Sequence, residues 1–159
     1  MSSEKILRLA WNGTDFHQLD LLLINASSDI SELTQQHQAY PLLHFYHTKT
    51  PEEASAVSIA ILDDLLTLLH YGLKDKESVN VILVQETRSS IETYLDTLTS
   101  VYIRPSEKEP NRPDIKSLEN TGIPFVTEEA FTRDLDGTIA RGRNAAGCGY
   151  LGQARMAGI

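Results

Sequence analysis

The sequence predicts an all-α fold, and more specifically a helical bundle. Three stretches of the chain carry apolar residues at steps of three and four, which is the period of an amphipathic helix. Proline, glycine and small polar residues stand where these stretches begin and end. With 159 residues and 41% hydrophobic content, the chain fits one domain with a core of its own. We therefore expect long helices near residues 15–40, 51–71 and 77–102, and a smaller helical C-terminal part.

The first long helix is predicted over residues 15–40. Thr14 can cap its start, and Pro41 biases Tyr40 away from helical angles, so the helix should end or kink there. A break into two shorter helices at Ser27-Ser28 is the main alternative. The predicted seam consists of Phe16, Leu19, Leu23, Ala26, Ile30, Leu33, His37 and Tyr40.

The second long helix has the clearest boundaries. Thr50, Pro51 and Glu53 offer an N-cap, a proline at the first helical position and a capping-box glutamate, and Gly72 supplies a stop. The preceding residues, 41–47, should form a further helical turn or two. Two adjacent apolar stripes make this helix the most buried one expected: Ala54, Val57, Ile61, Leu65 and Leu68, beside Ile59, Leu62, Leu66 and Leu69.

The third long helix is predicted over residues 77–102, with Ser78 or Asp75 as its cap, and it cannot outlast Arg104-Pro105. Residues 79–84 are β-branched enough to form a strand instead, which we keep as the alternative. The helical positions are Val81, Val84, Ile91, Tyr94, Leu98 and Val101.

The remainder of the chain suggests a division at residues 104 and 136. Residues 1–104 would form the bundle core. Residues 105–136 would add a charged, proline-rich linker and two short helices, one capped by Asp114 and one starting at Thr127 and running through Leu135. Residues 137–159 contain no Asp or Glu and most of the glycines, so we expect a tail that is disordered or is not native domain sequence.

Composition excludes several partners and places. A net charge of −8 and a pI of about 5.0 argue against nucleic acid. Cys148 is the only cysteine, so no disulfide framework or cysteine cluster is possible. The first residues lack a secretory signal, and no window approaches the roughly 18 uninterrupted apolar residues of a membrane helix. We therefore expect a cytoplasmic chain that does not itself insert into a membrane.

The stretch Asp134-Leu-Asp136-Gly137-Thr138 has the spelling of the nucleophile motif of haloacid-dehalogenase-like phosphatases. In such enzymes a buried strand precedes the aspartates, and lysine and further carboxylates follow them. Here the preceding residues have a helix-start signature, and residues 139–159 contain no Lys, Asp or Glu. The alternative is a chance match in which both aspartates end a helix at Gly137, and this is the interpretation we favour.

Other chemistry-bearing residues give weak signals. His44 and His47 have the spacing of a metal pair, with Asp63 and Asp64 as conceivable neighbours, but no third ligand follows from the spacing. His37 fits a satisfied core or interface histidine. Asp63 lies beside an apolar arc and needs partners, for which His44, Tyr46 or Tyr71 are available. We expect a structural role for these residues, and we predict no catalytic, metal or cofactor site and no enzyme.

Residues 38–69 read QAYPLLHFYHTKTPEEASAVSIAILDDLLTLL, and residues 114–131 read DIKSLENTGIPFVTEEAF. These two segments resemble the cytosolic C-terminal region of bacterial two-transmembrane potassium-channel-like proteins. The second is similar to a short helix followed by a Gly-hydrophobic-Pro hinge. The matching positions of the first are Tyr40, Pro41, Leu42, Phe45, Tyr46, Ala60, Ile61, Leu62 and Asp63.

The resemblance implies a non-enzymatic cytosolic domain of an ion channel, which would act in subunit assembly or in the regulation of gating beneath a potassium pore. Its partners would be further copies of itself, through the helix seams, and the membrane-embedded pore segment of the same protein. The alternatives are a free-standing helical interaction protein or, on the DLDGT stretch, a phosphatase. The long seam and the wide apolar arc exceed what a monomer of this size readily covers, which also favours a homo-oligomer.

Overall fold

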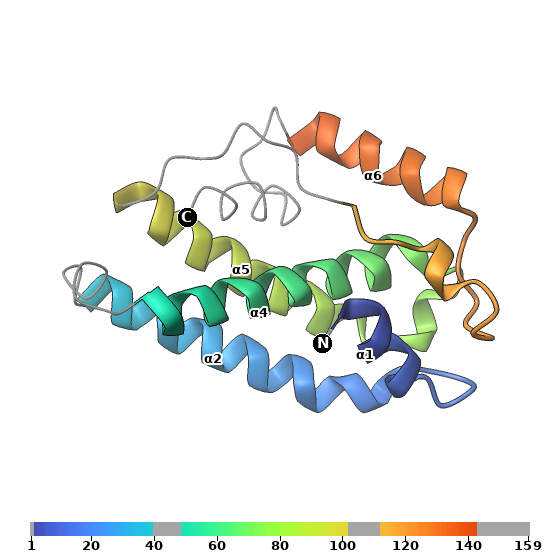
Figure 1. Ribbon diagram of the computed structural model, residues 1–159, viewed down its shortest axis with the longest axis horizontal. Coiled ribbons are helices and arrows are strands. Elements are labelled where there is room, and N and C mark those ends of the chain that lie inside the picture. The colour runs from blue at the N-terminus through green and yellow to red at the C-terminus, as the bar shows by residue number, and fades with distance from the viewer. Residues whose placement is uncertain (1, 40–48, 102–111, 143–159) are drawn as a thin grey trace.

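The fold is all-α, as the sequence predicts. The structure, a computed structural model, describes residues 2–39, 49–101 and 112–142 (Figure 1). For residues 49–54, 99–101 and 140–142 it describes the backbone and not the side chains. The described residues contain no strand, only one isolated bridge between Leu73 and Phe125. The α-helices are α1 (Ser3–Ala10), α2 (Asp20–Ala39), α4 (Lys49–Thr67), α5 (Val81–Val101) and α6 (Glu128–Gly142). Shorter turns are η1 (His17–Leu19), η2 (Leu68–Gly72), η3 (Lys76–Ser78) and η4 (Lys116–Leu118).

The three long helices form the body of the molecule. Helix α2 packs along α5, α4 also contacts α5, and the short α1 packs on α4. Polar contacts connect α2 to α5, because Thr87 Oγ1 donates to the Leu23 carbonyl at 3.3 Å and the Ser27 and Ser90 hydroxyls lie 2.8 Å apart. Helix α6 lies on the opposite side of the bundle from α2 and contacts η2 (Figure 1).

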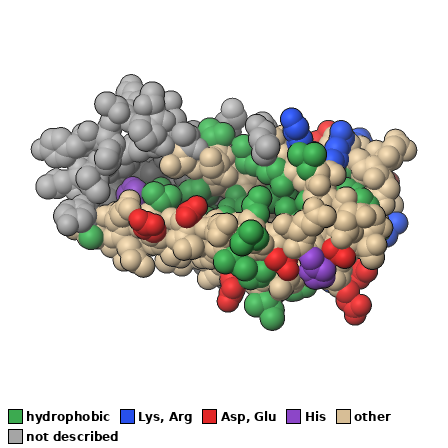
Figure 2. All heavy atoms as spheres, turned by 90° about the horizontal axis from the view of Figure 1, so that it is seen from below, with side chains coloured by type: hydrophobic (Ala, Val, Ile, Leu, Met, Phe, Trp, Pro, Cys, Tyr) green, Lys and Arg blue, Asp and Glu red, His purple; other side chains and the backbone are tan. Residues whose placement is uncertain are grey.

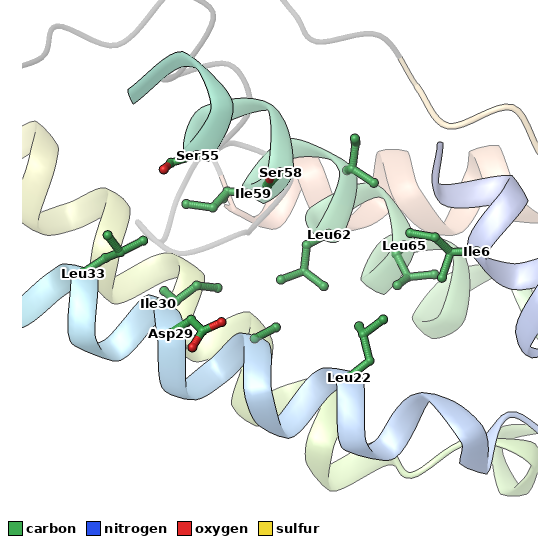
Figure 3. A pocket seen from close by; sticks show the side chains of 12 residues that line it. Ile6, Leu22, Asp29, Ile30, Leu33, Ser55, Ser58, Ile59, Leu62 and Leu65 are labelled. Carbon is green, nitrogen blue, oxygen red and sulfur yellow. The ribbon is translucent and has the colours of Figure 1, made fainter. Parts of the chain in front are cut away.

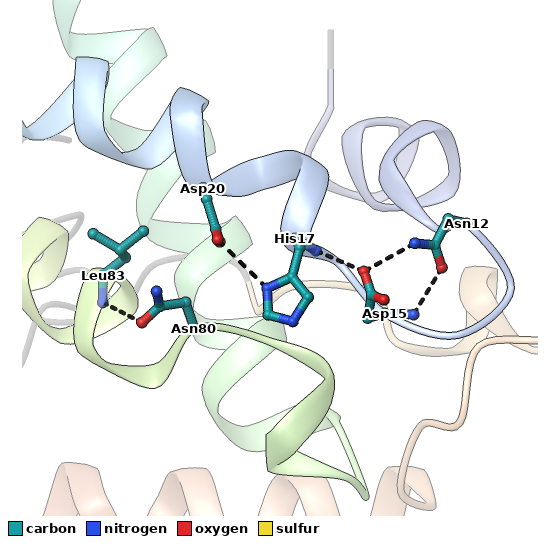
Figure 4. A network of polar contacts seen from close by, with 6 residues as sticks. All are labelled: Asn12, Asp15, His17, Asp20, Asn80 and Leu83. Carbon is teal, nitrogen blue, oxygen red and sulfur yellow. Dashed lines mark hydrogen bonds and ion pairs between the residues drawn. The ribbon is translucent and has the colours of Figure 1, made fainter.

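The predicted first long helix is present, but it begins later than expected. The 3-10 turn η1 precedes α2, which starts at Asp20 and runs unbroken past Ser27-Ser28 to Ala39. The loop before it is held by Asn12 and Asp15, not by Thr14 (Figure 4). Asn12 Oδ1 accepts from the Asp15 amide at 2.8 Å, and Asp15 Oδ1 accepts from the His17 amide at 3.0 Å.

Helix α1 was not predicted from the sequence. Its eight residues are too few to show a helical period, although Ser2 caps it by accepting from the Lys5 amide at 3.4 Å. Leu7 is fully buried and Ala10 nearly so, so α1 contributes one apolar edge to the core. One buried edge on so short a helix does not produce an apolar period that can be recognised in the sequence.

The predicted second long helix is confirmed as the centre of the core. Helix α4 begins at Lys49, one residue before the expected cap, and continues through the π-helical turn η2 to Gly72. Four leucines of this segment are fully buried: Leu65, Leu66, Leu68 and Leu69. The segment ends at Gly72 as predicted, and the position has no room for a side chain, because a Cβ there would lie 2.9 Å from Cδ1 of Phe125.

Gly72→Ala is expected to lower the free energy of unfolding by about 1–3 kcal/mol, because the added methyl group must displace the half-buried Phe125 ring. Urea titration followed by circular dichroism measures the change. The double variant Gly72→Ala/Phe125→Leu should recover part of the loss, since it makes room at the same point. An unchanged urea midpoint in the single variant would contradict the close packing of η2 on Phe125.

The third long helix is confirmed, and the strand alternative for residues 79–84 is wrong. Asp75 caps the turn η3 by accepting from the Glu77 amide at 2.9 Å, and Asn80 then accepts from the Leu83 amide at 3.3 Å. Helix α5 therefore starts at Val81, and its capping residue is Asn80, which was not predicted as a cap. Val79 is extended and buried, which explains why the β-branched run looked like a strand.

The C-terminal helical part follows the predicted caps. Asp114 accepts from the Lys116 amide at 3.0 Å at the start of η4, and Thr127 accepts from the Ala130 amide at 3.3 Å at the start of α6. Helix α6 does not end at Leu135 or Gly137 but continues to Gly142, with Phe131, Leu135 and Ile139 buried at four-residue spacing. The boundary expected at residue 137 thus falls inside a helix. The expectations for 40–48, 102–111 and 143–159 lie outside the described residues.

Candidate functional site

The two aspartates of the DLDGT stretch lie on the solvent side of α6. The side chain of Asp134 is 55% exposed and that of Asp136 is 50% exposed, and no strand precedes them in the described chain. Asp136 pairs with Arg112 at 2.7 Å, and Asp134 lies 3.6 Å from Arg133. Leu135, between them, points into the core. The buried strand-end geometry that a phosphoryl-transfer nucleophile requires is therefore not built by these residues.

The histidines give no metal site among the described residues. His37 is half-buried, its Nδ1 lies 2.8 Å from the Leu33 carbonyl, and its ring meets the Tyr94 ring edge-on at 5.6 Å. It is the satisfied histidine that the sequence predicts. His44 and His47 lie outside the described residues, and within these residues no three His, Cys, Asp or Glu side chains are grouped for a metal ion.

Asp63 is the one fully buried carboxylate of the described chain, with 1% of its surface exposed. Its ion-pair partner is Arg88 on α5, and the Tyr71 ring packs instead against His70, with ring centroids 4.6 Å apart. The Arg88 guanidinium lies 3.8 Å from Asp63 Oδ1, which is an ion pair beyond hydrogen-bonding distance. Neither carboxylate oxygen accepts a hydrogen bond from the residues that the structure describes, so the charge of Asp63 is compensated only in part.

Burial raises the pKa of Asp63 to about 7. The positive charge of Arg88 opposes this rise, whereas the negative charges of Asp64 and Glu92 add to it. Arg88 also lies 3.5 Å from Thr67 Oγ1, one turn along α4 from Asp63, so a single arginine spans both groups. Asp63 thus has the environment of a group that changes charge near neutral pH. It does not line the groove between α2 and α4.

An open apolar groove runs between α2 and α4 (Figure 3). The two helices lie antiparallel along it, so that Leu33 faces the start of α4 while Leu22 lies near Leu65, and α1 closes that end with Ile6. Its volume is about 500 Å³, within the usual range of ligand sites. The lining residues are Ile6, Leu22, Ala26, Asp29, Ile30, Leu33, Ser55, Ser58, Ile59, Ile61, Leu62 and Leu65.

The groove is apolar on its floor and has one acidic side chain, Asp29, in its lining. Ile30, Ile59 and Leu65 are buried, whereas Leu22 at the rim is 40% exposed. Residues 20–39 and 55–72 contain five Asp or Glu and no Lys or Arg, but one of the five, Asp63, is buried against Arg88 of α5 and does not face the groove. Figure 2 shows hydrophobic side chains on the α2 face with acidic side chains beside them, while Lys and Arg lie towards its edges.

The groove was not predicted as a site, although its signal was in the sequence. The seam of α2 and the two stripes of α4 together carry more apolar surface than α5 and α1 cover. Helix α1 is only eight residues long, so it fills the position of a fourth bundle helix at one end alone. Periodicity does not predict which two helices lie apart and leave the apolar stripes that face each other uncovered.

One stretch of the described chain, Ser55–Gly72, is long and apolar enough to cross a membrane by length and composition. The same stretch is the central helix of the bundle, with buried Asp63 and Thr67 facing α5, and core helices of globular proteins meet the same criterion. We therefore describe it as a core helix.

Comparison with known proteins gives one informative relative. The chain is 45% identical over 127 residues to the uncharacterized membrane protein YdjJ of Bacillus subtilis (strain 168). The match covers 80% of this chain but 37% of that protein, so the chain spans little more than a third of the relative's length. No protein-family model matches the chain, and no solved structure matches it.

These findings correct the sequence interpretation in two respects. The resemblance to potassium-channel-like proteins, with the gating, assembly and ion-transport roles that it implied, is not supported, because the matching relative is a membrane protein with no channel activity in its name and no channel family matches. The expected cytoplasmic location is also not supported, since the relative is named as a membrane protein. The pattern matches at Tyr40-Pro41 and in residues 114–131 were too short to be specific.

Proposed function

We propose that the chain is a non-catalytic helical binding domain of a membrane-associated protein, and that the groove between α2 and α4 is its binding surface. The observation that carries this proposal is the groove itself, which is apolar, has a volume of about 500 Å³ and lies between two helices that each present an apolar stripe to it. Exposed apolar channels of this size on a protein surface commonly serve binding.

The absence of an assembled catalytic centre in the described residues supports the non-catalytic part of the proposal. Asp134 and Asp136, the aspartates of the only catalytic motif in the sequence, are half-exposed on a helix. Membrane association rests on the relative, which is named as a membrane protein and extends far beyond the matched region. The homo-oligomer expected from the sequence stays a prediction, for which Leu21 and Ile24 on α2 offer exposed apolar surface.

Filling the groove tests the proposal. Ala26→Phe places a ring between the two walls, and it is expected to reduce the fluorescence enhancement of the neutral apolar dye Nile red several-fold. Ser28→Phe adds the same ring to an exposed position of α2 outside the groove and should leave the enhancement unchanged or slightly higher. Equal dye binding by both variants, with circular dichroism showing both folded, would refute the groove as a binding surface.

A further inference from the structure

Three features together indicate what kind of molecule the groove binds. Its floor is apolar and follows helical spacing on both walls, with Leu22, Ala26, Ile30 and Leu33 on one side. From Leu22 to Leu33 it extends about 16 Å, which is the length of about three helical turns. Helix α1 occupies this line only as far as Ile6. Among the described residues, the part of the groove beyond Ile6 therefore has the length of a helix of about three turns.

The charge around the groove discriminates among possible helices. All charged residues of residues 20–39 other than His37 are acidic, as are those of residues 55–72 other than His70. Asp29 lines the groove directly and is exposed. Lys5 and Arg8 of α1 belong to a separate hollow with Asp114 and Ser117. A helix lying in the groove thus meets the carboxylate of Asp29 beside its apolar face, and residues 20–39 and 55–72 bring no Lys or Arg to it.

This arrangement disfavours a second copy of the chain as the occupant. A symmetric pair formed through the groove would bring Asp29 and the other acidic residues of one α2 near those of its partner's α2, and like charges so placed weaken association. An apolar helix flanked by Lys or Arg gains from the same charges, and it also buries its apolar face.

We infer that the groove between α2 and α4 takes a cationic amphipathic helix of about three turns, supplied by another polypeptide segment. This inference rests on the proposed binding function and deepens it by naming the chemistry of the partner. The relative shows that a protein of this kind can contain a great deal of additional chain, since the match leaves nearly two thirds of YdjJ uncovered.

The test uses the whole chain and three fluorescein-labelled helical peptides of about 16 residues. They share one leucine face at i, i+4, i+7 and i+11 and differ only in flanking residues, which are Lys, Gln or Glu. In fluorescence anisotropy at low salt, the Lys peptide should bind at least tenfold more tightly than the Glu peptide, with the Gln peptide between them. Added salt should reduce this ratio, because it screens exposed charges.

Two charge-matched variants locate the effect. Asp29→Asn should reduce the preference for Lys over Glu at least twofold, whereas Glu86→Gln, which removes an exposed carboxylate of α5 outside the groove, should leave it unchanged. Ala26→Phe should abolish binding of all three peptides. Equal effects of Asp29→Asn and Glu86→Gln would overturn the inference, because the preference would then reflect only the net charge of −8.

Failure of this inference can be separated from failure of the proposed function. Equal binding of the three peptides, with loss on Ala26→Phe, would overturn the cationic partner and keep the groove as a binding surface. No binding of any peptide, together with unchanged Nile red fluorescence in Ala26→Phe, would overturn both. A dimer in light scattering that Leu22→Glu dissociates, or binding to neutral phospholipid vesicles that Ala26→Phe removes, would assign the groove to a second copy or to lipid and overturn the inference.

Discussion

Phe16→Ala is expected to lower the free energy of unfolding by about 3–5 kcal/mol, the usual range for removing a fully buried phenylalanine. Phe16 has no exposed surface, and its ring centroid lies 4.9 Å from that of Trp11. Its backbone amide also donates to the Ser78 carbonyl at 2.7 Å, which joins the loop before α2 to the turn before α5. The truncation would leave a cavity where α1, α2 and α5 meet.

Trp11 provides the measurement, because it is the only tryptophan of the chain and it contacts the mutated side chain. Urea unfolding of the variant should show a lower midpoint by both Trp fluorescence and circular dichroism. Leu21→Ala is the matched control, since Leu21 is 68% exposed and its truncation should change the stability by less than about 0.5 kcal/mol. A Phe16→Ala variant as stable as this control would mean that the loop does not pack on the core.

The long helices could be predicted because each carries an apolar stripe over five or more turns. In α4 the buried leucines 65, 66, 68 and 69 fall on the two stripes read from the sequence, and the buried Ile91, Tyr94 and Leu98 of α5 fall on its predicted face. Local caps were predictable where the capping side chain precedes a clear apolar run, as at Asp114 and Thr127. These are short-range properties of the chain.

Features that depend on tertiary contacts could not be predicted. Helix α1 is stabilised by packing Leu7 on its neighbours, not by a long period of its own. Residue 137 was predicted as a boundary because the acidic residues stop and the glycines begin there, yet α6 passes through it, since Phe131, Leu135 and Ile139 anchor the helix to the core on both sides. Packing of the apolar face outweighs the cost of one exposed glycine.

The candidate site could likewise be predicted only in part. Asp63 was recognised as a carboxylate in need of partners, but its partner Arg88 lies 25 residues away on another helix, and no local pattern connects them. The seams of α2 and α4 were recognised as apolar, and the homo-oligomer inferred from them stays a prediction. The groove exists because α2 packs along α5 instead of closing onto α4. Periodicity does not specify which helices pack against each other.

Wild-type stability is expected to fall as the pH rises from about 4 to about 7 through the contribution of Asp63. Its folded pKa of about 7 lies above the ordinary value of 3.8, so the folded state holds a proton that the unfolded state has released. Stability therefore decreases with pH across this window and is lowest, for this group, above pH 7. Asp63→Asn, which keeps the shape of the neutral form, should remove this slope and be more stable than the wild type at pH 8 by on the order of 3 kcal/mol.

Chemical unfolding at pH 5 and pH 8 measures this difference directly. At pH 5 the advantage of the variant should be much smaller than at pH 8, because Asp63 is still protonated in the folded state and only the part of the loss between about pH 4 and pH 5 has occurred. Glu86→Gln removes an exposed carboxylate from α5 and should retain the wild-type pH dependence. If Asp63→Asn were instead less stable than the wild type at pH 8, the carboxylate would be held as a stabilising anion. Its ion pair with Arg88, at 3.8 Å and with the arginine side chain 15% exposed, would then outweigh the cost of burying the charge.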